Sequence, residues 1–451
     1  MRSSWARHLY FTLQAIRREP VAAALRDVER SARLSRDALF AQQASRQRDQ
    51  LLFALERVPH YRRSLAPFAA DIRAARTWED VGTLMGRLPV LERETVAREY
   101  DSFVAPDVPR RETYPDSTSG SSGTPLRFAC DLRAWAYRHA LMYRCMADFG
   151  VAVGEPSALF FGLHWSTRAR ATVAARDWAF NRTRVSAYDI APARLQAHLA
   201  SLRRRRPTHA IGYPSAIFDF CVLVQDRGET LHDLSLKAVF LTAEPLRAHQ
   251  RELITRVTGA RCVDTYGSAE GGLSACECPA GSLHVNVETT WLELQGSGAT
   301  RGEAIVTDMM LRAFPMIRYA IGDDIELKPG ACECGRAHPM LASIEGRSGD
   351  AIVLPNGRRI NANLPSYIVK PFAGLGAIRR YRFVQEEGGT IELRLVVSRP
   401  LSPEMLDSLA RECVKAFGSD CPVRVLVVDS LPTLANAKHR DFVRSAASRP
   451  A

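Results

Sequence analysis

Apolar residues recur at helical spacing early in the chain and in short strand-like runs further on. Leu51, Leu52, Leu55 and Val58 lie at helical spacing, and residues 1–80 are therefore expected to be rich in helix. From about residue 128, apolar runs alternate with helical stretches. The apolar runs are 158–161, 210–213 and 238–241, and the helical stretches between them include 193–206 and 215–227. This alternation predicts an α/β fold with a parallel sheet.

The pattern changes twice toward the C-terminus. Residues 291–294 and 303–307 have the form of short antiparallel strands around glycine turns, which predicts a small β-subdomain. A polar, glycine-containing segment at 345–350 then marks a boundary, and the strands and helix beyond it predict an α+β unit of a common domain size. We therefore expect a large N-terminal domain over residues 1–347 and a smaller, mobile C-terminal domain over 348–451.

Length and composition fit a globular chain with more than one core. The 451 residues are 46% hydrophobic and 24% charged. No run of eighteen apolar residues occurs, so no membrane span is expected, and the basic N-terminus has no obvious signal-peptide cleavage site. A cytoplasmic protein is the expectation.

The net charge is +12, and its densest part is the arginine run at 203–206. No nucleic-acid-binding signature accompanies that run, and aromatic residues do not interleave with it. Cations at a helix C-terminus before Pro207 explain the run more simply. We expect no nucleic-acid partner, while attraction of small anionic substrates stays open.

Eight consecutive small or turn-forming residues occupy positions 118–125, with the sequence Thr-Ser-Gly-Ser-Ser-Gly-Thr-Pro. Such a loop exposes backbone N–H groups and hydroxyl donors without bulk, which suits close contact with a phosphate. No lysine follows the second glycine, so it is not the common P-loop pattern. A flexible linker is the alternative. A strand-like segment and a long helix follow the loop, and this context favours phosphate binding.

Further segments place polar side chains beside turns. Tyr266 and Glu270 follow a predicted strand, where the ring could stack on a purine and the carboxylate could ligate Mg²⁺. Taken alone, this segment is more simply interpreted as an ordinary strand-to-loop turn. Asp323 lies beside a glycine, where it suits ribose hydroxyls, although an ordinary β-turn is the default interpretation of the segment alone. Lys438 lies in a small-residue loop and by itself has the character of a surface lysine.

Ten cysteines in a reducing compartment would be thiols or metal ligands. Cys278, His284, Cys332 and Cys334 would make a Cys₃His tetrahedron, the composition of a structural zinc site. Cys276 competes with Cys278 for the first position. Free thiols are the alternative, because the two halves lie far apart in the sequence.

Taken in order, these segments resemble the adenylate-forming superfamily of acyl-CoA synthetases, adenylation domains and luciferases. Three segments resemble more narrowly its phenylacetate-CoA ligase and CapK group: Gly212-Tyr213-Pro214-Ser215, Thr242-Ala243-Glu244-Pro245 and the Cys-x-Cys-Gly-Arg run at 332–336. The resemblance extends from about residue 88 to residue 440.

The resemblance implies a set of ATP-binding residues. Those implied to hold the β- and γ-phosphates are Ser119, Gly120, Ser121, Ser122, Gly123 and Thr124. Those implied at the adenine and the strand end beside it are Ala243, Glu244, Pro245, Tyr266, Gly267 and Ser268. Asp323 and Arg347 are implied to hold the ribose.

It also implies the catalytic groups. Glu270 would serve Mg²⁺, and Lys438 would bridge the carboxylate oxygen and the α-phosphate during adenylation. Some members of the group have cysteines and a histidine at the positions of the Cys₃His set, which favours zinc there. The candidate acyl-pocket residues are His164, Trp165, Tyr213 and Ser215.

Two positions depart from the family pattern. Gly349 occupies the place of the usual hinge aspartate, which leaves the second half-reaction less certain, and Ala437 precedes the lysine where glycine is common.

The expected function is ATP- and Mg²⁺-dependent activation of a small carboxylic acid as acyl-AMP, with transfer to CoA. An amine or a carrier-protein thiol is the alternative acceptor. A nucleotide-binding regulatory or scaffold protein without turnover is the alternative of another class. A homodimer stays open.

Overall fold

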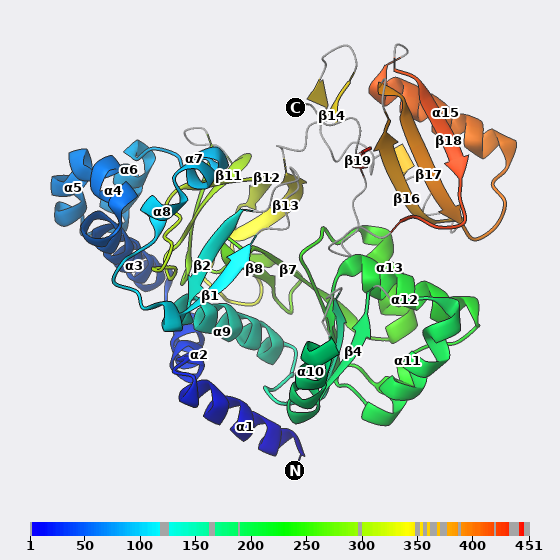
Figure 1. Cartoon of the computed structure of the whole chain (residues 1–451), viewed down its shortest axis with the longest axis horizontal. Helices are drawn as coiled ribbons and strands as arrows, with labels where there is room; N and C mark the ends of the chain where they lie inside the picture. Colours follow the sequence, from blue (N-terminus) through cyan, green and yellow to red (C-terminus); the bar gives the residue numbers. More distant parts are fainter. Residues whose placement is uncertain are drawn as a thin grey trace.

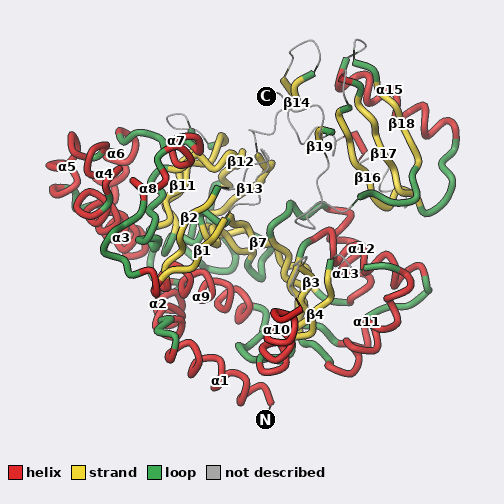
Figure 2. Tube along the Cα trace, in the orientation of Figure 1, coloured by secondary structure: helices red, strands yellow, loops and turns green. Residues whose placement is uncertain are grey.

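The computed structural model describes residues 2–117, 126–161, 167–187, 190–295, 300–347, 352–354, 359–360, 368–369, 377–386, 389–418, 421–432 and 442–445. Figure 1 shows an N-terminal helical layer, a large central sheet with its own helices, and a smaller C-terminal unit, and Figure 2 shows the same trace by secondary structure. All candidate site residues that the structure describes belong to the part of the chain before residue 348.

The first part of the chain is helical, as predicted. Its helices are α1 (Arg2–Ile16), α2 (Val21–Ser31), α3 (Arg36–Arg57), α4 (Pro59–Ser64), α5 (Ala69–Ala74), α6 (Trp78–Arg87), α7 (Arg93–Arg98) and α8 (Tyr100–Phe103), with 3₁₀ turns at Ala66–Phe68 and Arg110–Glu112. Ser35 caps α3 by accepting a hydrogen bond from Ala38 N, and Thr77 with Asp80 forms a capping box on α6. Leu51 and Leu55 of α3 are buried, which confirms the predicted apolar face.

One sheet of eleven strands runs through the centre of the molecule. Its strands are β3 (Ser157–Phe161), β4 (Arg182–Ser186), β5 (His209–Gly212), β6 (Ala238–Thr242), β7 (Arg261–Ser268), β8 (Gly272–Glu277), β9 (Leu283–Val285), β10 (Thr290–Leu294), β11 (Arg301–Asp308), β12 (Tyr319–Lys328) and β13 (Met340–Arg347). The spatial order is β10-β11-β12-β13-β9-β8-β7-β6-β5-β3-β4.

The sheet changes character at β7. Strands β4, β3, β5, β6 and β7 are parallel neighbours, as the alternation predicted, and the connecting helices are α10 (Thr167–Ala179), α11 (Pro192–Arg205), α12 (Pro214–Asp226) and α13 (Ala248–Thr258), with a 3₁₀ turn at His232–Leu234. From β7 to β10 every pairing is antiparallel. The strands expected to form a separate β-subdomain therefore extend the same sheet, because the β7–β8 hairpin reverses the chain within it.

A short ribbon stands apart from the central sheet. Strands β1 (Thr113–Ser117) and β2 (Arg127–Asp131) pair antiparallel, with Ser117 opposite Arg127. The segment 118–125 joins these two ends and lies outside the described residues. Helix α9 (Leu132–Asp148) follows β2 directly, and Asp131 caps it through a hydrogen bond from Ala134 N of 2.9 Å.

Among its described residues, the C-terminal unit has a four-stranded sheet and a long helix. Its elements are β16 (Ile378–Gln385), β17 (Ile391–Val397), α15 (Pro403–Phe417), β18 (Val423–Val427) and β19 (Phe442–Arg444), in the sheet order β18-β17-β16-β19; β14 (Ile352–Val353) and β15 (Arg359–Ile360) pair as a separate ribbon. Phe383, Leu393, Leu409 and Phe417 are fully buried in its own core. The predicted α+β character of this region is confirmed.

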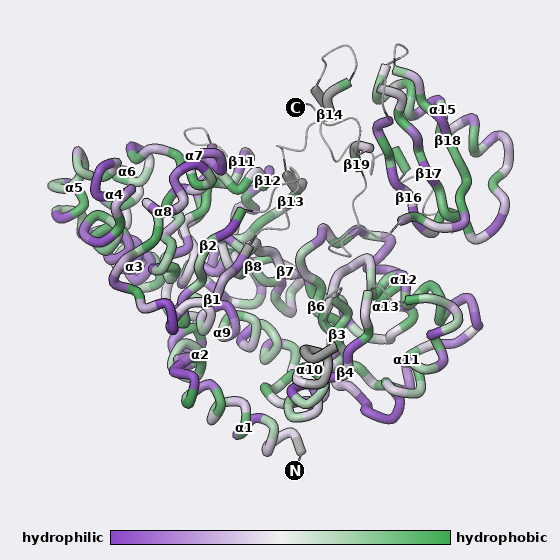
Figure 3. Tube along the Cα trace, viewed as in Figure 1, coloured by the Kyte–Doolittle hydropathy of each residue, from purple (hydrophilic) through white to green (hydrophobic). Residues whose placement is uncertain are grey.

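The hydropathy of the residues agrees with the positions of the elements in the fold. Figure 3 shows β17 as largely hydrophobic. The arginine run at 203–206 lies at the C-terminal end of α11. Arg203 of that run pairs with Asp233 and Glu229 at the surface. Among the described residues, no helix combines the length and the apolar character needed to cross a membrane.

Candidate active site

Predicted site residues follow the carboxyl ends of neighbouring parallel strands. Tyr213 and Ser215 come directly after β5, and the segment 243–245 comes directly after β6. Tyr266 lies near the end of β7. Because β5, β6 and β7 are adjacent and parallel, their ends meet at one edge of the sheet, the usual location of ligands in α/β sheets.

Tyr213 lies where β5 passes into α12. Its N–H donates to the carbonyl of Phe160 at 3.1 Å, and its ring packs edge-on against Phe161 with centroids 5.1 Å apart. A Cβ at Gly212 would lie only 2.4 Å from the Phe160 carbonyl oxygen, so glycine is required for this approach. The glycine of the Gly-Tyr-Pro-Ser segment is therefore required by local packing, in addition to the role predicted for the segment in binding.

The segment after β6 is held by α12. The Glu244 carboxylate accepts hydrogen bonds from both Ser215 N and Ser215 Oγ, each at 3.0 Å. Ala243 has a φ of +68°, in the left-handed region that residues with a Cβ rarely adopt. The predicted adenine segment and the predicted acyl-pocket serine are thus in direct contact.

The predicted adenine and ribose residues also meet. Tyr266 Oη donates to Asp323 Oδ2 at 2.7 Å, across 57 positions of sequence. On β12, Asp323 is opposite Arg347 of β13 in the strand register. The side chain of Arg347 lies outside the described residues, so its predicted contact with the ribose stays a prediction.

The carboxylate predicted for Mg²⁺ lies in the turn between β7 and β8. Glu270 is 2% exposed, and no hydrogen bond or ion pair joins it to another residue that the structure describes. Ser268 Oγ accepts from Gly271 N at 2.8 Å and closes the turn. A buried carboxylate with this environment fits a divalent cation, which prefers oxygen ligands.

An arginine missed by the sequence analysis supports that turn. Arg138 of α9 bridges Asp116 of β1 and Asp308 of β11, each at 3.4 Å. Burial raises the pKa of Asp308 despite this partner. Gly272 has a φ of +67°, and a Cβ there would lie 3.3 Å from both Arg138 Nε and Asp308 Oδ2. The network therefore connects the base of the ribbon that carries 118–125 with the Glu270 turn.

Several predicted residues lie outside the described part of the chain. They are Ser119, Gly120, Ser121, Ser122, Gly123, Thr124, His164, Trp165, Gly349 and Lys438. Their proposed roles are untested by the geometry.

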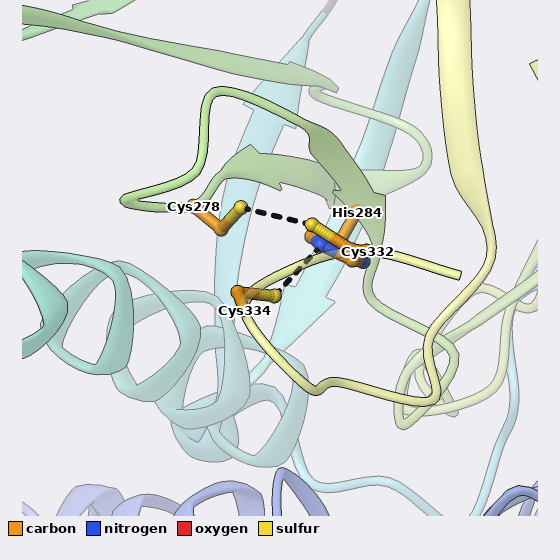
Figure 4. A group of neighbouring side chains, drawn as sticks. All are labelled: Cys278, His284, Cys332 and Cys334. Atoms are coloured by element: carbon orange, nitrogen blue, oxygen red, sulfur yellow. Dashed lines mark hydrogen bonds between the residues drawn. The ribbon is translucent and has the colours of Figure 1, made fainter.

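The Cys₃His set predicted from the sequence comes together in space. Ligand atoms of Cys278, His284, Cys332 and Cys334 all lie within 4.8 Å of one another. The Cys278 and Cys332 sulfurs are 3.7 Å apart, and Cys334 Sγ lies 3.3 Å from His284 Nε2. Dashed lines in Figure 4 mark these two contacts. Tight turns present the cysteines: Gly281 N donates to Cys278 O, and Gly335 N donates to Cys332 O. Three sulfurs and one imidazole nitrogen are the donor set of a closed structural zinc site.

The competitor Cys276 is not part of this group. It is buried beside Cys145 and Met146, and Asn286 Nδ2 lies 3.7 Å from its sulfur. Cys278 follows the end of β8, where the 278–282 turn redirects the chain toward the other ligands.

A buried polar network surrounds the cluster, and sequence spacing gave no sign of it. His284 Nδ1 is 3.0 Å from the carbonyl of His338, which leaves Nε2 facing the sulfurs. His338 Nε2 is 2.9 Å from Glu288, and Glu288 pairs with Arg144 of α9. Burial alone would raise the pKa of Glu288, but Arg144 and His338 hold it well below its usual range.

The cluster also contacts α9 through its own loop. Arg336, which follows the Cys-x-Cys turn, pairs with Asp148 at the end of α9 at 2.6 Å. The Cys₃His cluster is therefore connected at two points to the helix that follows the β1–β2 ribbon.

Known proteins with similar sequences agree with this architecture. No family model matches the chain. It is 25% identical over 413 residues to the phenylacetate-coenzyme A ligase of Thermus thermophilus, covering 85% of this chain and 87% of that protein. It is 23% identical over 368 residues to protein CapK of Staphylococcus aureus, covering 79% of each.

A solved structure shows the same fold over most of the chain. The structure of 2-hydroxyisobutyryl-CoA ligase in the postadenylation state superimposes with a TM-score of 0.70 at 18% identity, covering 91% of this chain and 90% of that one. The similar sequences and the shared fold agree with the resemblance to the adenylate-forming superfamily that the sequence motifs indicated. Both similar sequences come from the phenylacetate-CoA ligase and CapK group, the group that its sequence motifs resemble.

Proposed function

We propose that the protein activates a carboxylic acid with ATP and transfers the acyl group to CoA. A carboxylate oxygen attacks the α-phosphorus, and pyrophosphate leaves. The CoA sulfur, as thiolate, then attacks the acyl carbon, and AMP leaves with the C–O bond electrons. The observation that carries the proposal is the Tyr266–Asp323 hydrogen bond at the sheet edge where the predicted nucleotide segments meet.

Different residues of the chain would carry out the separate parts of this reaction. Tyr266 would pack beside the adenine, and Asp323 would accept hydrogen bonds from ribose hydroxyls beside Arg347. The 119–124 loop would bind the β- and γ-phosphates through its N–H and O–H donors. Glu270 would hold Mg²⁺, which neutralises phosphate charge when bound. Lys438 would place a positive charge where the two anions meet.

The Cys₃His cluster is proposed to bind Zn²⁺ as a structural ion. Four protein ligands leave no open position for a substrate, so the ion would clamp the β8–β9 and β12–β13 connections rather than catalyse. Thiolate ligands persist in a reducing compartment, and the proposal therefore includes a cytoplasmic location.

The test is pyrophosphate release across a panel of aryl, fatty and hydroxy acids, each with and without CoA. We expect acid-dependent release that rises with CoA, together with an acyl-CoA product identified by mass spectrometry. Release with no CoA dependence would redirect the second step to an amine or a carrier-protein thiol. ATP binding with no release from any acid would contradict the enzymatic proposal and favour a regulatory or scaffold protein.

Tyr266→Phe tests the nucleotide site. The substitution removes the 2.7 Å bond to Asp323 while keeping the ring. A hydrogen bond to a charged group contributes about 1.5 kcal/mol, so we expect the KM for ATP to rise roughly tenfold with little change in kcat. Tyr213→Phe, just after the end of β5 at the same sheet edge, is the matched control and should leave the KM for ATP within about twofold. Equal effects of both substitutions would contradict the assignment of Tyr266.

A further inference from the structure

Helix α12 begins without a cap from its own sequence. Tyr213 occupies the N-cap position and makes no side-chain capping bond, and Pro214 follows at the first helical position. The first N–H groups of a helix have no intrahelical acceptor and carry a partial positive charge. Glu244 supplies the missing acceptor from another segment, because its carboxylate accepts from both Ser215 N and Ser215 Oγ at 3.0 Å. Ser215 is only 8% exposed, so this contact is shielded from water.

The backbone conformation of Ala243, the residue before Glu244, explains why this segment needs a contact that holds it in place. Ala243 has a φ of +68°, a conformation that a residue with a Cβ adopts only where the surroundings impose it. On one side Thr242 ends β6, paired with Thr265 of β7. On the other side the Glu244 carboxylate is fixed to α12. The 243–245 segment is therefore held at both ends in a disfavoured shape.

We infer that Glu244 is a positioning residue, which acts through the backbone of 243–245 and through Ser215 rather than by its own contact with ATP. The inference rests on the proposed function, in which 243–245 lines the adenine and Tyr213 and Ser215 lie beside the acyl group. It also reassigns Ser215, whose hydroxyl donates to Glu244 instead of being available to the acid. One carboxylate thereby sets the nucleotide segment and the acyl-side segment relative to each other.

Because Glu244 holds both segments, its loss should change the KM of both substrates. Glu244→Ala should raise the KM for ATP and the KM for the acid together, each by about tenfold, because both segments lose the same anchor. Glu244→Gln keeps the shape but loses the charge, and should have a smaller effect on both. Ser215→Ala removes only the hydroxyl bond and keeps the N–H bond, so we expect about a threefold rise in both values. Glu252→Gln, an exposed glutamate on α13, is the control and should change neither.

A rescue experiment separates positioning from general destabilisation. Glycine adopts a positive φ without a steric penalty. In Ala243→Gly/Glu244→Ala, the segment no longer needs an anchor to hold a disfavoured shape, and we expect at least a threefold recovery of both KM values. Circular dichroism and the thermal midpoint should be the same in the single and double variants within about 2 °C.

ATP affinity measured by calorimetry without any acid tests the inference independently of turnover. Glu244→Ala should weaken ATP binding about tenfold even if no acid in the panel is a substrate. A change in the KM for ATP alone would mean that Glu244 contacts the nucleotide directly, and would overturn the inference. Unchanged ATP affinity in Glu244→Ala, or no recovery in the double variant, would also overturn it. Failure of the wild type to release pyrophosphate would count against the proposed function and leave the calorimetric result to decide the inference.

Discussion

Replacing Lys438 by alanine is expected to lower carboxylate-dependent ATP–pyrophosphate exchange by at least about a hundredfold. In adenylation a carboxylate approaches a phosphate that is itself negative, so the rate depends on cations placed where the two charges meet. A preorganised charge of this kind typically contributes about 3 kcal/mol or more to the barrier. A lysine delivered by a separate domain supplies it only when that domain closes.

The measurement is isotope exchange between pyrophosphate and ATP at saturating acid, which reports adenylation alone. Lys438→Arg keeps the charge with different geometry and should retain part of the activity. ATP affinity and the far-ultraviolet circular dichroism should be close to those of the wild type in both variants. Exchange at the wild-type rate in Lys438→Ala would remove this residue from the mechanism.

The part of the fold that could be predicted from the sequence is the part that a repeated hydrophobic pattern determines. Alternating apolar runs and helices predicted a parallel sheet that includes β3, β5 and β6, and the ends of parallel strands necessarily share an edge. The continuation of the same sheet through β13 was not predictable. It depends on the β7–β8 reversal, where a Cβ at Gly267 would lie 2.4 Å from the Gly272 carbonyl oxygen. A turn of this kind looks in the sequence like any glycine-containing loop.

The segments that form the site could be predicted from the sequence. Most of the contacts between their side chains could not. Tyr266 and Asp323 were assigned to one nucleotide by family resemblance, and the structure places them 2.7 Å apart. The Glu244–Ser215 contact was missed because the two residues are 29 positions apart on separate crossovers, so no spacing rule connects them. The roles of the 119–124 loop, Lys438 and Gly349 stay predictions, as does the oligomeric state.

The Cys₃His cluster, too, was predictable in part. Residue types and order predicted three cysteines and a histidine, and the geometry confirms that set. The choice between Cys276 and Cys278 needed the structure, since the turn after β8 decides which sulfur faces His284. The buried Arg144–Glu288–His338 network behind the ligands had no sequence signal, because its members come from three separate segments.

Loss of zinc is expected to have the second large effect, on stability. Cys334→Ser should lower the zinc content far below one ion per chain and lower the unfolding midpoint by about 5–10 °C, corresponding to a loss of roughly 3 kcal/mol. Binding free energy at a structural zinc site contributes directly to folding, because the unfolded chain offers no preformed ligands. The same variant should also weaken ATP binding, because Arg336–Asp148 and His338–Glu288–Arg144 connect the cluster to α9.

Cys276→Ala is the matched control for this prediction. It removes a thiol two positions from a ligand, yet its side chain packs with Cys145 and Met146 outside the cluster. We expect it to keep one zinc per chain by atomic absorption, with only the modest loss of stability of a small cavity. Wild-type protein purified without chelators but carrying well under one zinc per chain would contradict the structural role. So would zinc loss in Cys276→Ala combined with retention in Cys334→Ser, because the ion would then depend on a sulfur that faces the hydrophobic core.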